Sequence, residues 1–339
     1  MRTKLKLGII PLVLVALFCE FSYSQDLHYS QFYNSPLNLN PALTGIFNGD
    51  QRFTASVRDQ WRFVPIPWFT FSGAYDFRLP TESEERLIGL GININYDRQG
   101  DSKLTLASLN IAGSYSLVLS KNHILSGGLL LGLGNRGFDT RNLTWDKQWT
   151  GDSFDPSLGS GESFDVQSVT FLETAAGVNY RIQKTSRTKV DLGVSAYHLI
   201  QPTTNFYNTD DKKLPINLGF VLIGSVQLIE SLDLQLHGLH QIQSSYGETV
   251  LGCLGKVYLN SRRGKETEIH VGMGYRTAGS YIPTVALKYR EWYAAISYDV
   301  DKTEFNQILN NNKGGPEVHL RYIITKVKPL KVIKLCPIY

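Results

Sequence analysis

The side chains of this sequence that could do chemistry are its serines, histidines and carboxylates, and their spacing fits none of the common catalytic motifs. The chain has no Gly-x-Ser-x-Gly nucleophile elbow, no phosphate-binding P-loop and no His-Glu-x-x-His zinc motif. His237 and His240 are three positions apart, so on a strand they would point to opposite faces and could not share a metal ion. We therefore expect a protein that is not an enzyme and that binds no cofactor.

A second group of ionisable residues lies toward the C-terminal end, in two runs in which apolar and polar residues alternate. Its members are His270, Arg276, Glu317, His319 and Arg321. Because alternate residues of a strand share a face, we expect these side chains on the polar face of their strands. There they either form a hydrogen-bonded ladder that fills the interior of a barrel or line a conduit.

The elements that would position these residues are strands, because alternation with period two dominates the chain. Ile88, Leu90, Ile92, Ile94 and Tyr96 alternate with small or polar residues, and about fourteen such runs can be counted. Several extend over roughly 10–15 residues, whereas globular strands average about 5–6 and a membrane-crossing strand needs about 9–11. This pattern predicts an all-β fold, a transmembrane antiparallel β-barrel of about 14 strands. A soluble β-sandwich would alternate too, but strand length and export favour the barrel.

The first residues predict export. Arg2, Lys4 and Lys6 precede the apolar run 7–18, and small residues at Ser22 and Ser24 suit cleavage before Gln25. We expect residues 1–24 to be a signal peptide. Without it the net charge falls from +4 to +2, since three cations and one carboxylate are removed. That balance disfavours a nucleic-acid-binding surface.

The mature chain is expected to have three parts. Residues 25–50 show neither helical nor strand periodicity and form an irregular N-terminal segment, which is either periplasmic or plugs the barrel. Residues 51–325 form the outer-membrane barrel, and residues 326–339 form a basic periplasmic tail. An even strand number places both termini on the periplasmic side, with short turns there and longer loops outside. Whether Cys253 and Cys336 are free is left open.

Two loops that are predicted to lie outside the membrane contain aromatic residues. The connection 61–68 contains Trp61, Phe63 and Trp68 beside two prolines, and the acidic loop 137–168 contains Trp145 and Trp149. Tryptophan is enriched at binding hot spots, so we expect these five residues to contact a protein partner. For the connection 61–68 the alternative is that it tucks into the barrel mouth. Spaced carboxylates in the second loop leave a calcium site open as an alternative.

The irregular segment carries a family resemblance. The residues that carry it are His28, Ser30, Gln31, Phe32, Pro36, Asn40 and Pro41. With Arg52, Arg58 and the Trp61 region, this pattern resembles the PorP/SprF family, whose members belong to the type IX secretion system of Bacteroidota. The likeness extends over the whole mature chain.

The resemblance implies an integral outer-membrane barrel that is paired with one secreted protein. Such a barrel helps to export its cargo, for example a large surface adhesin, and anchors the C-terminal domain of that cargo at the cell surface, in some cases for gliding motility. The periplasmic ring and motor of the machine, or peptidoglycan-associated proteins, are further implied partners, beside outer-membrane lipid; nucleic acid is not. The family has no catalytic residues to carry over.

Two other classes of function stay open. An outer-membrane porin or small-molecule transporter would have an open or gated lumen, and a lipase-type enzyme barrel would need a Ser–His pair that the sequence does not single out. The identity of the cargo, whether the lumen is plugged, and whether the chain is a core machine component or a dedicated anchor are not determined by the sequence.

Overall fold

The computed structural model describes residues 27–60, 68–81, 85–141, 143–164, 166–207, 213–262, 265–277, 279–301 and 314–325. The predicted signal peptide 1–24, the predicted tail 326–339 and the predicted contact residues Trp61 and Phe63 lie outside these ranges.

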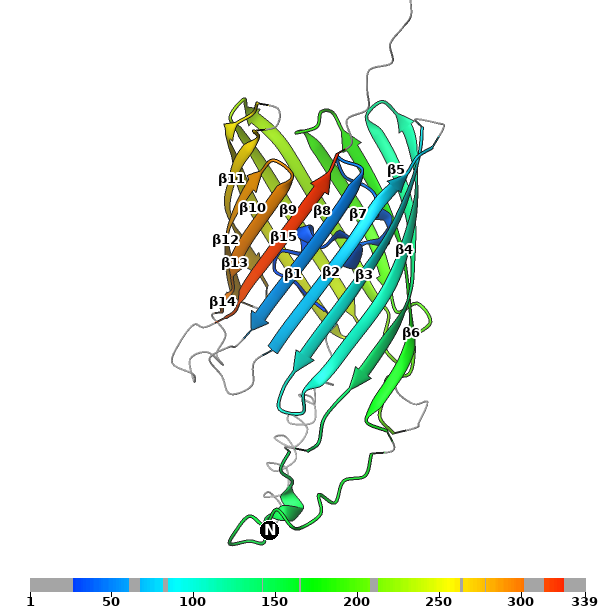
Figure 1. The fold of residues 1–339 in the computed structure, drawn as a ribbon, viewed down its shortest axis with the longest axis vertical. Coiled ribbons are helices and arrows are strands. Elements are labelled where there is room, and N and C mark those ends of the chain that lie inside the picture. The colour runs from blue at the N-terminus through cyan, green and yellow to red at the C-terminus, as the bar shows by residue number, and fades with distance from the viewer. Residues whose placement is uncertain are drawn as a thin grey trace, which may run out of the picture.

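One closed antiparallel sheet forms the wall of the molecule (Figure 1). Its strands are β1 (Gln51–Gln60), β2 (Trp68–Leu79), β3 (Arg86–Gln99), β4 (Leu104–Ser120), β5 (His123–Gly137), β6 (Ser168–Gln183), β7 (Lys189–Tyr197), β8 (Asn217–Ile229), β9 (Leu232–Gln243), β10 (Tyr246–Asn260), β11 (Thr267–Arg276), β12 (Ser280–Tyr289), β13 (Trp292–Tyr298), β14 (Val300–Asp301) and β15 (Pro316–Ile324). Each pairs with its neighbour, and β15 pairs with β1 to close the ring. The short β14 continues β13 along β12, so the wall has the fourteen positions that the sequence predicts.

The wall is apolar outside and polar inside. On β3, Ile92 and Ile94 point outward and are 41% and 46% exposed, whereas Asn93 and Asn95 point inward and are 1% and 6% exposed. The same alternation recurs around the ring. A water-soluble sandwich would bury the apolar face, so this arrangement is that of a barrel whose outer surface meets lipid.

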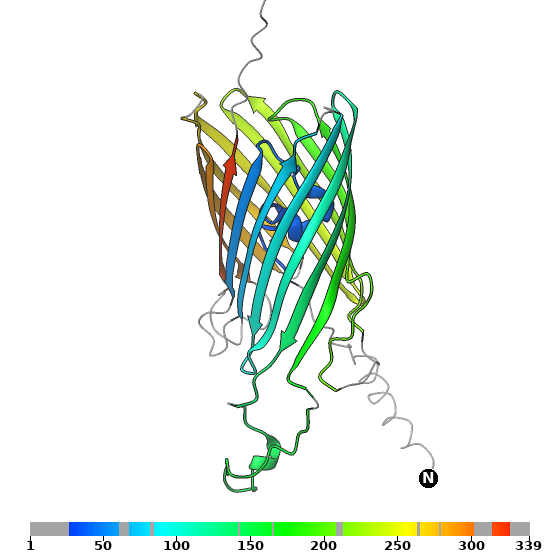
Figure 2. The same ribbon diagram turned by 45° about the vertical axis from the view of Figure 1, so that its right-hand side comes forward.

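The connections differ between the two ends of the barrel. At one end, here the short-turn end, the strands are joined by residues 80–85, 121–122, 184–188, 230–231, 261–266 and 290–291. At the other, the long-loop end, they are joined by residues 61–67, 100–103, 138–167, 198–216, 244–245, 277–279 and 302–315. The three longest connections share one end, as the sequence predicts. The loop 138–167, with the short helix η3 (Asp146–Gln148), projects well beyond the barrel wall (Figures 1 and 2).

Residues 27–50, here called the interior segment, run through the inside of the barrel (Figure 2). The segment contains η1 (Phe32–Asn34), α2 (Pro36–Leu39) and η2 (Pro41–Leu43). Leu27 lies beside Gln99 and Leu104, which flank a connection of the long-loop end, whereas Asp50 donates its backbone N–H to Ile324 at the short-turn end. The segment therefore crosses the lumen from one end to the other before β1 begins. No helix among the described residues is long and apolar enough to cross a membrane.

Candidate functional site

The interior segment is folded by local signals in its own sequence. Pro36 and Pro41 occupy the first positions of α2 and η2, where a missing backbone N–H costs nothing. Asn40 caps η2, because its side-chain oxygen accepts the N–H of Ala42 at 2.9 Å. Gly45 follows with a φ of 70°, a left-handed conformation that glycine adopts readily. The segment is thus a chain of single helical turns that needs the wall to hold it.

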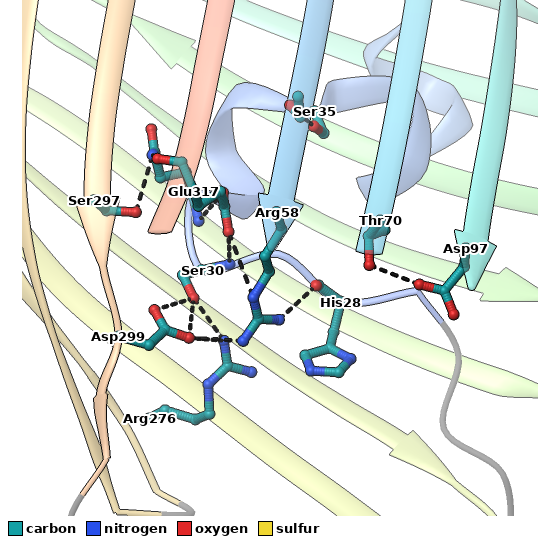
Figure 3. A network of polar contacts seen from close by, with 12 residues as sticks. His28, Ser30, Ser35, Arg58, Thr70, Asp97, Arg276, Ser297, Asp299 and Glu317 are labelled. Atoms are coloured by element: carbon teal, nitrogen blue, oxygen red, sulfur yellow. Dashed lines mark hydrogen bonds and ion pairs between the residues drawn. The ribbon is translucent and has the colours of Figure 1, made fainter. Parts of the chain in front are cut away.

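Two carboxylates of the wall hold the start of the segment, near the long-loop end (Figure 3). Glu317 of β15 accepts the backbone N–H groups of Ser30 and Gln31 at 2.7 and 2.9 Å. Asp299, between β13 and β14, accepts the hydroxyl of Ser30 at 2.6 Å. Hydrogen bonds to charged groups are stronger than those between neutral groups, so these contacts fix the position of the backbone at residues 30 and 31.

Two arginines complete this cluster, which we call the Asp299 anchor (Ser30, Gln31, Arg58, Glu248, Arg276, Asp299 and Glu317). Arg58 of β1 contacts Asp299 at 2.6 Å and donates to the backbone carbonyl of His28 at 2.8 Å. Arg276 of β11 donates to the Ser30 hydroxyl at 2.8 Å and pairs with Glu248. Removing one partner of a buried ion pair is strongly destabilising. Because Arg58 and Arg276 both bond to the segment, the anchor couples the segment to distant strands.

A second cluster, the Asp76 anchor (Gly45, Arg52 and Asp76), holds the end of the segment near the short-turn end. Asp76 of β2 accepts the backbone N–H of Gly45 at 2.7 Å and pairs with Arg52 at 2.7 Å. Arg52 also lies over the ring of Phe47, 4.5 Å from its centre. Arg78 donates to the carbonyls of Phe47 and Gly49. The segment is therefore fixed at both ends by charged groups of the wall.

Apolar contacts fill the space between the two anchors. Leu37 packs into a small cluster on strands β4 to β6, and it is only 1% exposed. Phe32, Leu39 and Leu43 pack against inward-facing apolar residues of β8, β9, β10 and β12, namely Val221, Leu239, Val250 and Ile282. The interior of the barrel thus has its own small hydrophobic core, built from both the segment and the wall.

Amide side chains join the segment to the wall between these apolar groups. Asn38 bonds to Asn93 and Asn95 of β3 at 2.6 and 2.9 Å. Asn40 donates to the carbonyls of Val178 and Val194 at 3.0 and 3.2 Å. Asn40 therefore serves as helix cap and wall contact at once.

Replacing Asn40 by alanine tests this double role. We expect the variant to lose roughly 1–2 kcal/mol of unfolding free energy, the usual cost of a lost helix cap, measured by denaturant unfolding in detergent micelles. Asn48→Ala is the matched control, since Asn48 belongs to the same segment but is exposed. Equal losses for the two variants would show that the wall contacts of Asn40 contribute nothing.

Glycines shape the wall to accept the segment. A Cβ at Gly128 of β5 would lie 2.4 Å from backbone atoms of Pro41 and Ala42, and one at Gly89 of β3 would lie 2.2 Å from the carbonyl oxygen of Thr44. A Cβ at Gly177 of β6 would lie 2.0 Å from the Asn40 side chain. Larger residues at these three positions cannot coexist with the segment in its present place.

The motif residues of the irregular segment come together inside the barrel. Ser30, Gln31, Phe32, Pro36, Asn40 and Pro41 are all buried, while His28 is partly buried. They contact strands around the circumference, including β1, β6, β7, β13 and β15.

The five polar residues expected to form one network occupy separate places. Arg276 and Glu317 belong to the Asp299 anchor. His319 contacts the Ser56 hydroxyl at 2.8 Å, His270 pairs with Glu268 at 3.0 Å, and Arg321 lies over the ring of Tyr293. All five point inward, but the rise of about 3.3 Å per residue distributes them along the barrel axis. His270 and Arg276 are therefore roughly 20 Å apart on one strand.

Among the predicted partner-contact residues, Trp149 is 58% exposed in the loop 138–167, with Phe154 beside it at 44%. Trp145 instead packs against Phe164, with ring centres 6.1 Å apart. Phe164 continues into a cluster with Phe138, which also contacts Phe206 of the neighbouring loop. Trp68 is partly buried at the start of β2.

Sequence patterns alone do not single out Asp299 as the partner of Ser30, or Glu248 as the partner of Arg276. They mark Arg58 only as part of the family resemblance. Inward parity on their strands was the available signal, but it does not say which inward residues lie at the same level as residue 30. Among the described residues, no three His, Cys, Asp or Glu side chains are grouped so that they could hold a metal ion.

Comparison with known proteins agrees with this architecture. A crystal structure of a FadL homologue from Pseudomonas aeruginosa is similar, with a TM-score of 0.50 and 10% identity, over 84% of this chain and 92% of that one. The toluene transporter TodX of Pseudomonas putida has a TM-score of 0.48 and 11% identity, over 85% and 91% of the two chains. At such identities the first likeness shows the fold alone.

No curated protein matches the sequence. The family described as "Type IX secretion system membrane protein PorP/SprF" matches residues 21–322, nearly the whole of the barrel and the interior segment. The chain belongs to the PorP/SprF family of type IX secretion system membrane proteins.

Proposed function

We propose that this barrel anchors one secreted protein at the cell surface, helps its export, and does so without catalysis. The interior segment is the observation that carries the proposal. It is fixed at both ends by buried charges and packs against the inner wall of the lumen, which supports a barrel that has no wide path for a polypeptide. A barrel that holds such a segment is better suited to holding a partner at its mouth than to conducting one.

The partner surface would be the long-loop end. Short turns face the periplasm in bacterial barrels and long loops face outward, which places the loop 138–167 outside the cell. Its base is held by the aromatic cluster around Phe138 and Phe164, while Trp149, Phe154 and Leu158 at its tip are exposed. An apolar tip on a braced loop fits a protein contact. The partner would be the C-terminal domain of the secreted protein.

Replacing Trp149 and Phe154 together by alanine tests the docking surface. We expect the cargo on the cell surface to fall by tenfold or more, because hot-spot aromatics each contribute roughly 2 kcal/mol or more to an interface. Surface immunoblotting of intact cells and of the medium measures retention. Thr144→Ala, at an exposed position of the same loop, is the control. Unchanged retention in the double variant would contradict docking at this loop.

The second candidate, a small-molecule transporter, has one observation in its favour. The long-loop half of the lumen contains a cavity of about 80 Å³, lined by apolar residues such as Leu106 and Phe171 and by amide and charged side chains such as Asn110, Glu173 and Gln241. This space holds only a few water molecules, and the interior segment lies between it and the short-turn end. The cargo-anchoring function therefore explains the described structure better than a transporter does.

A further inference from the structure

Beside the end of the interior segment, toward the short-turn end, three cations face the lumen. Lys189 of β7, Lys256 of β10 and Arg321 of β15 all occupy inward-facing positions. Lys256 lies opposite His270 in register, the ring of His270 is 5.3 Å from that of Tyr293, and Arg321 lies over the same Tyr293 ring. Strands β7 and β15 are on opposite sides of the fourteen-position ring. The charges therefore face one another across the lumen, which is unfavourable unless something between them compensates it.

None of the three has a carboxylate partner among the described residues. Lys256 donates to the Ser225 hydroxyl at 3.3 Å, and the guanidinium of Arg321 lies over the Tyr293 ring at 4.3 Å. Within the described ranges, the ammonium of Lys189 makes neither a hydrogen bond nor an ion pair. Lys189 and Lys256 come from strands on either side of Ser225: Lys189 is opposite it in register and Lys256 bonds to it.

The carboxylates nearest to these cations are already paired. Each is held by a different basic residue: Asp191 by Arg181 at 2.8 Å, Asp233 by Arg187 at 2.6 Å and Glu268 by Lys288 at 2.5 Å. Asp191 further accepts from Asn179, and Asp233 from Tyr258. These bonds occupy most acceptor positions of Asp191 and Asp233. The single negative charge of Glu268, which also contacts His270, is already balanced by Lys288. The positive charge of Lys189, Lys256 and Arg321 is thus a local excess.

We propose that Lys189, Lys256 and Arg321 form a binding site for a phosphate-type oxyanion inside the short-turn end of the barrel. Arginine offers a planar fork that matches phosphate oxygens, and lysine supplies point charges beside it. The guanidinium of Arg321 lies over the Tyr293 ring, 4.3 Å from its centre, and this contact limits where the arginine can go. A narrow lumen with low-dielectric walls strengthens such attraction. By the turn-length rule the site opens to the periplasm.

The test is phosphate binding to the purified full-length mature barrel in an uncharged detergent, measured by titration calorimetry. We expect saturable binding of one inorganic phosphate per barrel. The variant K189Q/K256Q/R321Q should bind phosphate at least about tenfold more weakly, since the loss of even one hydrogen bond between a charged side chain and the ion lowers the affinity by about that factor. The matched control K121Q/K184Q/K265Q removes three exposed lysines from turns at the same end and should bind phosphate as the wild type does.

Thermal unfolding shows whether the lumen variant is folded. Removing mutually repelling charges should raise the midpoint of the lumen variant without phosphate. Phosphate should raise the midpoint of the wild type and of the control variant, but not that of the lumen variant. A soluble short-chain phosphatidic acid, tested in parallel, distinguishes a lipid headgroup from free phosphate as the source. The proposal is overturned if neither ligand binds saturably, if the control loses binding equally, or if an oligo-glutamate peptide binds where phosphate does not.

Discussion

Gly128→Val is expected to displace the interior segment and open the lumen. The new Cβ would lie 2.4 Å from backbone atoms of Pro41 and Ala42, and backbone cannot yield as the end of a flexible side chain can. Overpacking of this kind costs about 1–3 kcal/mol or more when the structure must absorb it. Because the wall is continuous and the segment is not part of it, the segment is the component that should move.

The adjacent residue supplies the control. Gly127 lies on the same strand but faces outward, and a Cβ there meets nothing within 4 Å. Gly127→Val therefore changes the same strand by the same side chain without touching the segment. In planar lipid bilayers we expect discrete conducting steps for Gly128→Val, and none for the wild type or for Gly127→Val. Conduction by the wild type, or equal behaviour of the two valine variants, would show that the segment does not close the lumen.

Asp299→Asn is expected to release the start of the segment and to lower the unfolding free energy by about 3–5 kcal/mol, the usual cost of breaking a buried ion pair. Asp299 is 1% exposed and contacts Arg58, Arg276 and Ser30. Asparagine keeps the shape but removes the charge that both arginines face. Denaturant unfolding in detergent micelles measures the loss.

Asp139→Asn makes the same chemical change in a solvent-exposed pair. Arg141 beside Asp139 holds the pKa of that carboxyl well below its usual range, yet the arginine side chain is 85% exposed. Exposed pairs contribute little because water and salt screen them, so we expect no measurable change in stability. If the two substitutions cost the same, the Asp299 anchor would be no more than a surface ion pair.

The strand pattern of this protein could be predicted because a barrel repeats one rule. Every wall residue faces either lipid or lumen, so alternation such as Ile92, Asn93, Ile94 and Asn95 marks a strand wherever it occurs. Turn lengths followed from the same runs, and the longest loops fell at one end. These features depend on near neighbours in sequence, which a single chain displays directly.

The candidate site could be predicted only in part, because it depends on distances along the barrel axis. Parity places His270 and Arg276 on the same face, but it says nothing about their levels along the barrel axis. The alternation therefore predicts one network where the structure has several. Asp299 lies 269 positions from Ser30 in sequence, and only closure of the ring brings them together. The course of the segment from the long-loop end to the short-turn end has no local signal, since its prolines and Asn40 fix turns rather than direction.

If one secreted protein is held at the long-loop end of this barrel, the two should be purified together. The experiment is an affinity-tagged barrel, purified from detergent-solubilised outer membranes and analysed by quantitative mass spectrometry. We expect one large secreted protein in near-equal amount, lost when Trp149 and Phe154 are replaced by alanine. Recovery of the wild-type barrel alone, together with conductance of that barrel in lipid bilayers, would instead favour a transporter and exclude the anchoring function.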